Sequence, residues 1–169
     1  PRESAKKLPV LDLILEGEHG KLEFKQTFRW NAKGQVSSKE LEKAAMKTIS
    51  AFLNTDGGTL IVGVTDNGKI HGMTEDYSSL VRKDRDGFEN HFNQCVKSMI
   101  GTELRQYVVV TFETIDEKDV CLIEVSPSPK PVYMKTNDHE EFFIRTGNTT
   151  SALKISEVNS YIDLHWQKI

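Results

Sequence analysis

Three acidic residues, Glu18, Glu23 and Asp66, have the types and placement from which a divalent metal centre can be built. Glu18 lies in a turn before the first expected strand, Glu23 faces outward on that strand, and Asp66 follows a second strand expected to neighbour it. Carboxylate oxygens suit Mg²⁺ and Mn²⁺, and a bound cation lowers the pKa of its water for phosphodiester cleavage. The spacing is compatible with a metal-dependent nuclease centre, and equally with three surface acids that share no purpose.

Lys25 lies two residues after Glu23 in a segment that alternates apolar and polar side chains, which predicts a half-buried strand over residues 21–28. Because side chains two residues apart share a strand face, we expect Glu23 and Lys25 side by side on the open face. A lysine at this place can orient an attacking water or stabilise a phosphorane. Lys25 is therefore a fourth candidate catalytic residue.

Seven cationic side chains against three acidic ones fall between Lys21 and Lys47, although the chain as a whole carries a net charge of -3. The net charge argues against a protein that coats nucleic acid by charge alone, whereas the local excess can attract phosphates or form a solvated helix face. Trp30 and Tyr133 can add a stacking surface or only close the core. The candidate nucleic-acid contacts are Lys25, Arg29, Lys33, Lys130, Lys135, Arg145 and Asn148.

Three helices are expected to support these residues. The first runs from about Ser38 to Leu53, after the capping-box pattern Ser37-x-x-Glu40 and with apolar side chains at helical spacing. The second runs from about Gly87 to Ile100, and we interpret His91 in its apolar stripe as a buried helix residue rather than a ligand. A last helix is expected from a cap at Ser156 to about residue 166.

Strands are expected between and after these helices. Gly57-Gly58 leads into a buried strand over residues 59–64, and Asn67-Gly68 favours a tight hairpin turn directly after Asp66. Charged residues 74–86 predict a loop. The remaining predicted strands cover residues 107–115, 119–125, 132–135 and 141–145, followed by a polar turn over 145–150.

The order of these elements predicts an α+β domain with a mixed, largely antiparallel sheet and helices on one side. Its 169 residues fit a single domain, which we place at 9–169, with the polar segment 1–8 as a linker or tail. Since the chain begins at Pro1 without a methionine, we expect it to be part of a larger chain. The isolated Cys95 and Cys121 predict core thiols in a cytoplasmic protein, and no apolar run is long enough for a membrane span.

Four segments together resemble the Schlafen AlbA_2 domain family: Glu18-(x)4-Glu23-Phe24-Lys25, SAFLNTDGGTLIVGVTD at 50–66, IHG at 70–72 and FFIRTGNTT at 142–150. The resemblance covers about residues 11–166 and implies a nucleic-acid-binding domain. In nuclease-active Schlafens, two glutamates and an aspartate form a metal-dependent site that cleaves tRNA and rRNA. The matching positions here are Glu18, Glu23 and Asp66, while Thr65 stands where the family often has another aspartate.

Nuclease-active members carry two such lobes in one chain and this chain has one, so a homodimer would supply the second. We therefore expect a domain that binds nucleic acid, RNA such as tRNA rather than DNA, with an endoribonuclease centre that uses Mg or Mn. The alternative is a non-catalytic nucleic-acid- or nucleotide-binding module of a larger regulatory or defence protein. A third hypothesis is a domain that only binds other proteins.

Overall fold

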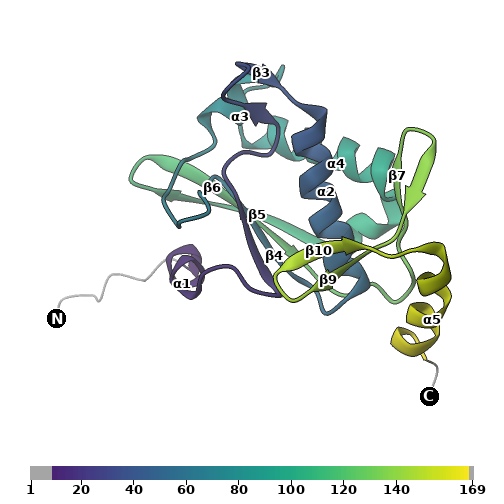
Figure 1. The fold of residues 1–169 in the computed structure, drawn as a ribbon. Helices are drawn as coiled ribbons and strands as arrows, with labels where there is room; N and C mark the ends of the chain where they lie inside the picture. Colours follow the sequence, from purple (N-terminus) through teal and green to yellow (C-terminus); the bar gives the residue numbers. More distant parts are fainter. Residues whose placement is uncertain (1–8, 168–169) are drawn as a thin grey trace.

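The structure is a computed structural model that describes residues 9–167, so the predicted linker at 1–8 lies outside the described residues. A four-stranded sheet in the order β1-β4-β6-β5 lies at its centre (Figure 1). Its strands are β1 (Leu22–Lys25), β4 (Gly58–Val62), β5 (Val108–Ile115) and β6 (Lys118–Val125). β1 pairs with β4 in parallel, and the other two pairings are antiparallel. The predicted α+β class with a mixed, largely antiparallel sheet is confirmed.

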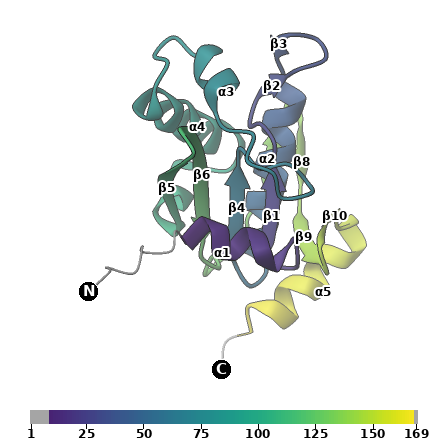
Figure 2. The ribbon, with the colours of Figure 1, turned by 90° about the vertical axis from the view of Figure 1, so that its left-hand side faces the viewer.

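The helices are α1 (Pro9–Glu16), α2 (Lys39–Asn54), α3 (Thr74–Ser78), α4 (Arg85–Met99), the 3-10 helix η1 (Thr102–Tyr107) and α5 (Ile155–His165). Leu60 and Val62 of β4 face the larger core, which α2 and α4 cover. Ile61, between them, faces a smaller core on the opposite side, which α1 covers through Val10 (Figure 2). The expected helices on one side are thus α2 and α4, and α1 adds a cover to the other face.

The helix starts depend on local caps. Ser38 is the N-cap of α2, and its side chain accepts the Leu41 backbone N–H at 3.3 Å, so the cap is Ser38 rather than Ser37. The last helix starts earlier than predicted, because its N-cap is Lys154 and not Ser156. The predicted first helix is otherwise confirmed within about one residue at each end.

Residues 74–86, predicted as a loop, contain the short helix α3 and the start of α4. Asp76 of α3 is fully buried, and its carboxylate accepts three consecutive backbone N–H groups, Phe28 to Trp30, at 2.7 to 3.0 Å. These bonds give hydrogen-bond acceptors to the backbone N–H groups of the chain where it leaves β1. The loop prediction was wrong because the partner of Asp76 lies 46 to 48 residues away.

Three small hairpins complete the fold: β2 (Trp30–Asn31) with β3 (Val36–Ser37), β7 (Met134–Thr136) with β8 (His139–Glu141), and β9 (Phe143–Thr146) with β10 (Thr149–Ala152). The predicted strand at 141–145 is divided between β8 and β9, and the predicted turn at 145–150 is the tip of the β9-β10 hairpin. Gly147 at this tip has a φ of 63°, which glycine adopts without strain.

Both cysteines are free thiols buried in the larger core, as predicted, with Cys95 on α4 and Cys121 on β6. Over residues 9–167, none of the helices combines the length and the apolar character needed to cross a lipid bilayer.

Candidate functional site

Glu23 points from β1 toward α2 and is held on three sides. The Thr48 hydroxyl donates to its Oε2 at 2.5 Å, Arg145 Nη1 donates to its Oε1 at 3.2 Å, and Lys25 Nζ lies 3.7 Å from Oε2. The side chain is only 16% exposed. The expectation of an open strand face was therefore wrong for Glu23, because α2 and β9 cover that face.

Arg145 is the residue that ties β9 to the start of β1. Its side chain is 3% exposed, and its guanidinium donates to the backbone oxygens of His19 (3.0 Å) and Gly20 (3.2 Å) as well as to Glu23. It also lies 5.0 Å from the Phe52 ring centroid. Arg145 thus positions the Glu23 carboxylate, and a phosphate contact would require its guanidinium to leave these acceptors.

Glu18 is exposed at the free edge of β1. His19 and Leu22 exchange backbone hydrogen bonds of 3.0 and 3.1 Å, which fold the preceding turn back along the strand. The backbone N–H of Phe24 points away from β4, on the free edge of β1. It donates to the Glu18 Oε1 at 2.9 Å. Glu18 therefore lies next to the strand position of Glu23.

Asp66 is exposed in the predicted tight turn, which a backbone hydrogen bond from Gly68 to Thr65 closes at 2.9 Å. This turn lies beside α1, because a side chain at Gly68 would come within 3.1 Å of Ile14. Glu23 instead points to α2, on the other face of the sheet. The turn that carries Asp66 and the Glu23 carboxylate therefore lie on different faces of the sheet.

Within residues 9–167, the one group of three potential metal ligands whose ligand atoms all lie within 4.8 Å of one another is Glu42, His91 and Cys95. The three predicted acids do not form such a group in this arrangement. Binding of one Mg²⁺ or Mn²⁺ by Glu18, Glu23 and Asp66 would require these side chains to move, and it stays a prediction.

The predicted phosphate contacts differ in how free they are. Arg29 is largely buried, donating to Glu42 Oε1 at 2.9 Å and to the Ser79 backbone oxygen at 3.0 Å. Lys130 is exposed and pairs with Glu103 at 3.1 Å. The others are exposed: Lys33, Lys135 and Asn148.

The basic segment from Lys21 to Lys47 keeps a positive excess in the folded chain. Each of its three acidic side chains forms an ion pair with one basic side chain of the segment. The pairs are Lys25 with Glu23, Arg29 with Glu42, and Lys43 with Glu40. The remaining four form no ion pair with any described residue: Lys21, Lys33, Lys39 and Lys47. Lys21, Lys33 and Lys39 are exposed and can bind an anionic partner, whereas Lys47 is partly buried, with its Nζ 5.6 Å from the Phe143 ring centroid.

A hollow of about 360 Å³ lies between the end of β1, the β2-β3 loop and the start of α2. Trp30 and Lys33 line it together with Gln26, the residue after Lys25. An aromatic ring beside a cation is the combination that binds a nucleic-acid base and its phosphate. The hollow therefore places an aromatic ring beside a lysine of the basic segment.

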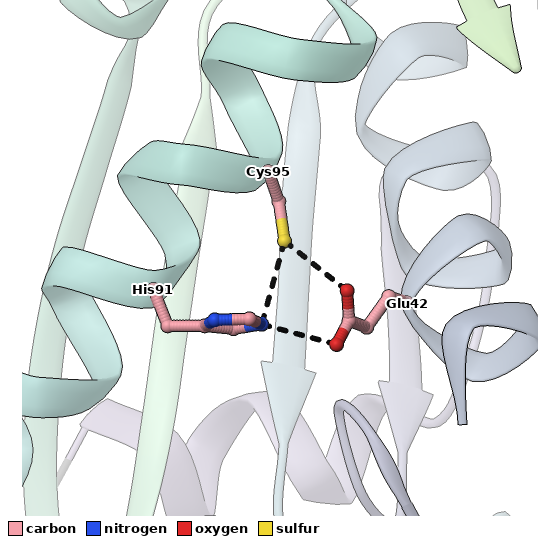
Figure 3. A group of neighbouring side chains, drawn as sticks. All are labelled: Glu42, His91 and Cys95. Carbon is pink, nitrogen blue, oxygen red and sulfur yellow. Dashed lines mark hydrogen bonds and ion pairs between the residues drawn. The ribbon is translucent and has the colours of Figure 1, made fainter. Parts of the chain in front are cut away.

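The group of Glu42, His91 and Cys95 was missed by sequence reasoning, which counted Glu42 among the acids of the basic segment. Figure 3 shows His91 and Cys95 one turn apart on α4, both facing Glu42 from α2. The available signal was the place of Glu42 seven residues before Ile49, on the buried side of α2.

The electrostatics of this group follow from burial and from the contacts among its members. Burial favours a higher pKa for Glu42, but the hydrogen bond and charge of His91, with hydrogen bonds from Cys95 and Arg29, outweigh it and hold the pKa below its ordinary value. Burial and the Glu42 charge raise the pKa of the Cys95 thiol to about 12. Cys95 is therefore a protonated donor to Glu42 rather than a nucleophile.

Comparison with solved structures finds ten matching chains, which include the following two. The DIP2311 protein from Corynebacterium diphtheriae has a TM-score of 0.60 and 19% identity over 92% of this chain and 31% of that one. The N-terminal domain of a protein described as related to the ATP-dependent DNA helicase RecG, from Nitrosomonas europaea, has a TM-score of 0.52 and 22% identity over 88% and 94% of the two chains. This chain thus spans about a third of the DIP2311 protein.

No curated protein matches the sequence. A sequence model of the family described as Schlafen, AlbA_2 matches residues 18–154, which include every candidate residue named above from Glu18 to Asn148. This match covers most of the 169 residues. The chain belongs to the Schlafen AlbA_2 family.

Proposed function

We propose that this domain binds nucleic acid, RNA in preference to DNA, on the basic side formed by β1, the β2-β3 loop and α2. The observation that carries the proposal is the set of four lysines without an acidic partner among the described residues, Lys21, Lys33, Lys39 and Lys47, of which Lys33 lines the same hollow as Trp30. Because the net charge is -3, binding must use such a local surface rather than the overall charge.

Two comparisons support this role. The Schlafen AlbA_2 family is associated with nucleic acid, and the fold is shared with the N-terminal domain of a protein related to a DNA helicase. The preference for RNA rests on the family resemblance, in which nuclease-active members cleave tRNA and rRNA. Exposed lysines would contact phosphates, and Trp30 would stack on an unpaired base.

Fluorescence anisotropy with labelled tRNA and single-stranded DNA tests the binding. The variant Lys33→Ala/Lys39→Ala is expected to bind RNA about tenfold more weakly, with a salt slope reduced by about two because two phosphate contacts are lost. Lys97→Ala, an exposed lysine on α4, serves as the matched control and should bind as the wild type does. No affinity for either nucleic acid would contradict the proposal and favour a protein-interaction domain.

We further propose that Glu18, Glu23 and Asp66 bind Mg²⁺ or Mn²⁺ and that Lys25 assists cleavage of the bound RNA. The observation that favours this is the Glu18 carboxylate folded beside β1, with Lys25 3.7 Å from Glu23. The metal would activate water and neutralise phosphate charge. In the observed arrangement the carboxylates do not reach one shared ion, so Glu23 would have to exchange Thr48 or Arg145 for the metal.

Cleavage of a tRNA pool in the presence of Mn²⁺ tests this second step. Glu18→Ala and Asp66→Ala change exposed carboxylates, so they should preserve the fold and reduce cleavage at least a hundredfold without weakening RNA binding. Glu140→Ala, an exposed acid on β8, is the control and should cleave normally. If the wild type binds RNA and leaves it intact, the catalytic proposal fails and the non-catalytic module is favoured.

The nuclease-active relatives use two lobes, so we propose that two copies of this chain act on one RNA. Sedimentation velocity of the protein–RNA complex should give two chains per RNA. A single chain per RNA at saturation would contradict the homodimer.

A further inference from the structure

The group of Glu42, His91 and Cys95 lies apart from the acids of β1, in the interface between α2 and α4 (Figure 3). The His91 Nε2 is 3.0 Å from Glu42 Oε1, the Cys95 Sγ is 3.4 Å from Glu42 Oε2, and the Sγ is 3.6 Å from the His91 Nε2. One nitrogen, one sulfur and one carboxylate therefore converge on a small buried volume.

We propose that Glu42, His91 and Cys95 form a binding site for a divalent transition-metal ion, Zn²⁺ in the native protein. Bonds of about 2.0 Å to oxygen and nitrogen and about 2.3 Å to sulfur place the ligand atoms of tetrahedral zinc roughly 3.3 to 3.6 Å apart. The observed separations, 3.0 to 3.6 Å, lie close to these values, although His91 contacts Oε1 and Cys95 contacts Oε2 of Glu42. With one oxygen per carboxylate, all three ligand atoms lie within 4.8 Å of one another. A thiolate and an imidazole also select zinc over the harder Mg²⁺.

The backbone already fixes the site. His91 and Cys95 are four residues apart on α4, so they share one helix face, and Glu42 lies opposite on α2. Glu42 is also hydrogen-bonded by Arg29 at 2.9 Å, the type of outer contact that orients a carboxylate ligand. Conversion to a metal-bound site would require the Glu42 carboxylate to turn, because His91 and Arg29 contact its Oε1 and Cys95 contacts its Oε2.

The site also has access to solvent. The His91 side chain is 26% exposed and, with Arg29 and Asn90, lines a cavity of about 440 Å³. Three protein ligands leave a fourth tetrahedral position for a water or an exogenous ligand. On binding, the Cys95 thiol would release its proton to solvent, and the metal would take the place of that proton.

Titration of the metal-free, untagged chain with Co²⁺ tests the site. Thiolate-bound cobalt gives an intense near-ultraviolet charge-transfer band, and Zn²⁺ should displace it. The wild type is expected to bind one equivalent, whereas Cys95→Ser should lose the band and bind about a hundredfold more weakly. Cys121→Ser removes the other buried thiol of the same core and should titrate like the wild type.

Further readouts keep the test decisive if Cys95→Ser folds poorly. His91→Gln alters a half-exposed side chain and should weaken Co²⁺ binding at least tenfold, and Zn²⁺ should raise the Tm of the wild type by several degrees. A wild type without the charge-transfer band and without a Tm shift would overturn the proposal. Unchanged binding by a folded Cys95→Ser would do the same. RNA binding by the β1 side is measured separately, so either proposal can fail alone.

Discussion

Two glutamates of this domain are each held by an arginine, yet their surroundings suit different chemistry. Glu23 on β1 is 3.2 Å from Arg145 and 16% exposed, and Glu42 on α2 is 2.9 Å from Arg29 and 7% exposed. A hydroxyl and an ammonium group complete the contacts of Glu23, whereas an imidazole and a thiol complete those of Glu42. The first setting is compatible with the proposed Mg²⁺ or Mn²⁺, and the second with the proposed Zn²⁺.

Arg29 and Arg145 contribute little to the positive charge of the surface. The guanidinium groups of Arg145 and Arg29 are hydrogen-bonded to internal carboxylates and backbone oxygens. They therefore add little positive potential at the surface for a partner. The exposed lysines between Lys21 and Lys47 carry that potential instead. Arginine supports the fold at both glutamates, and lysine would supply the proposed recognition surface.

The largest expected effect is that of Arg145→Ala. It leaves Glu23 partly buried without its partner and removes the link from β9 to the turn before β1, so we expect a loss of about 3–5 kcal/mol in the free energy of unfolding. Urea denaturation measures this loss. Arg82→Ala, an exposed arginine paired with two aspartates, should leave the urea midpoint unchanged. Equal midpoints for Arg145→Ala and the wild type would show that this pair is dispensable.

A smaller effect, with a pH signature, is expected for Glu42→Gln in the metal-free chain. The pKa of Glu42 in the folded chain lies below its ordinary value of 4.5, so its stabilising contribution is present above pH 4.5 and is lost as the pH falls through the folded-state pKa. The variant should lose about 1–3 kcal/mol at pH 7 and show a flatter pH profile. Urea titrations between pH 7 and pH 3 measure both profiles, and parallel profiles would contradict this role of Glu42.

The smallest effect is expected for Thr48→Val, which removes the hydroxyl that donates to Glu23 while keeping the side-chain volume. We expect a loss of about 1 kcal/mol in the free energy of unfolding. A double-mutant cycle with Glu23→Gln isolates the pair, and the coupling energy should also be about 1 kcal/mol. Additive losses would mean that the 2.5 Å contact contributes nothing specific.

The sequence predicted the elements that local patterns specify. The apolar period and the serine cap predicted α2, and β-branched runs predicted β4, β5 and β6. Local patterns could not predict α3, because Asp76 is placed by backbone groups at the end of β1. The division of residues 141–152 into β8, β9 and β10 was missed for the same reason, since β9 is anchored to α2 by the contact of Asn54 with Phe143.

The sites were predictable to different degrees. Glu18 and Glu23 could be proposed from the sequence because they lie within one short motif and its family context. The surroundings of Glu23 were missed, since Arg145 comes from a segment 122 residues away. The contacts of Glu42 with His91 and Cys95 span 49 and 53 residues and carry no spacing motif. Only the packing of α2 against α4 reveals them.

The central claim is that RNA binds on the side of Trp30 and Lys33, and the two tryptophans of the chain test it directly. Trp30 lines the hollow in the basic segment, whereas the Trp166 indole donates to the Ser128 backbone oxygen beyond α5. In an NMR titration with a short single-stranded RNA, the Trp30 indole N–H resonance should shift and the Trp166 resonance should stay in place. An unshifted Trp30 resonance at saturating RNA would contradict the claim.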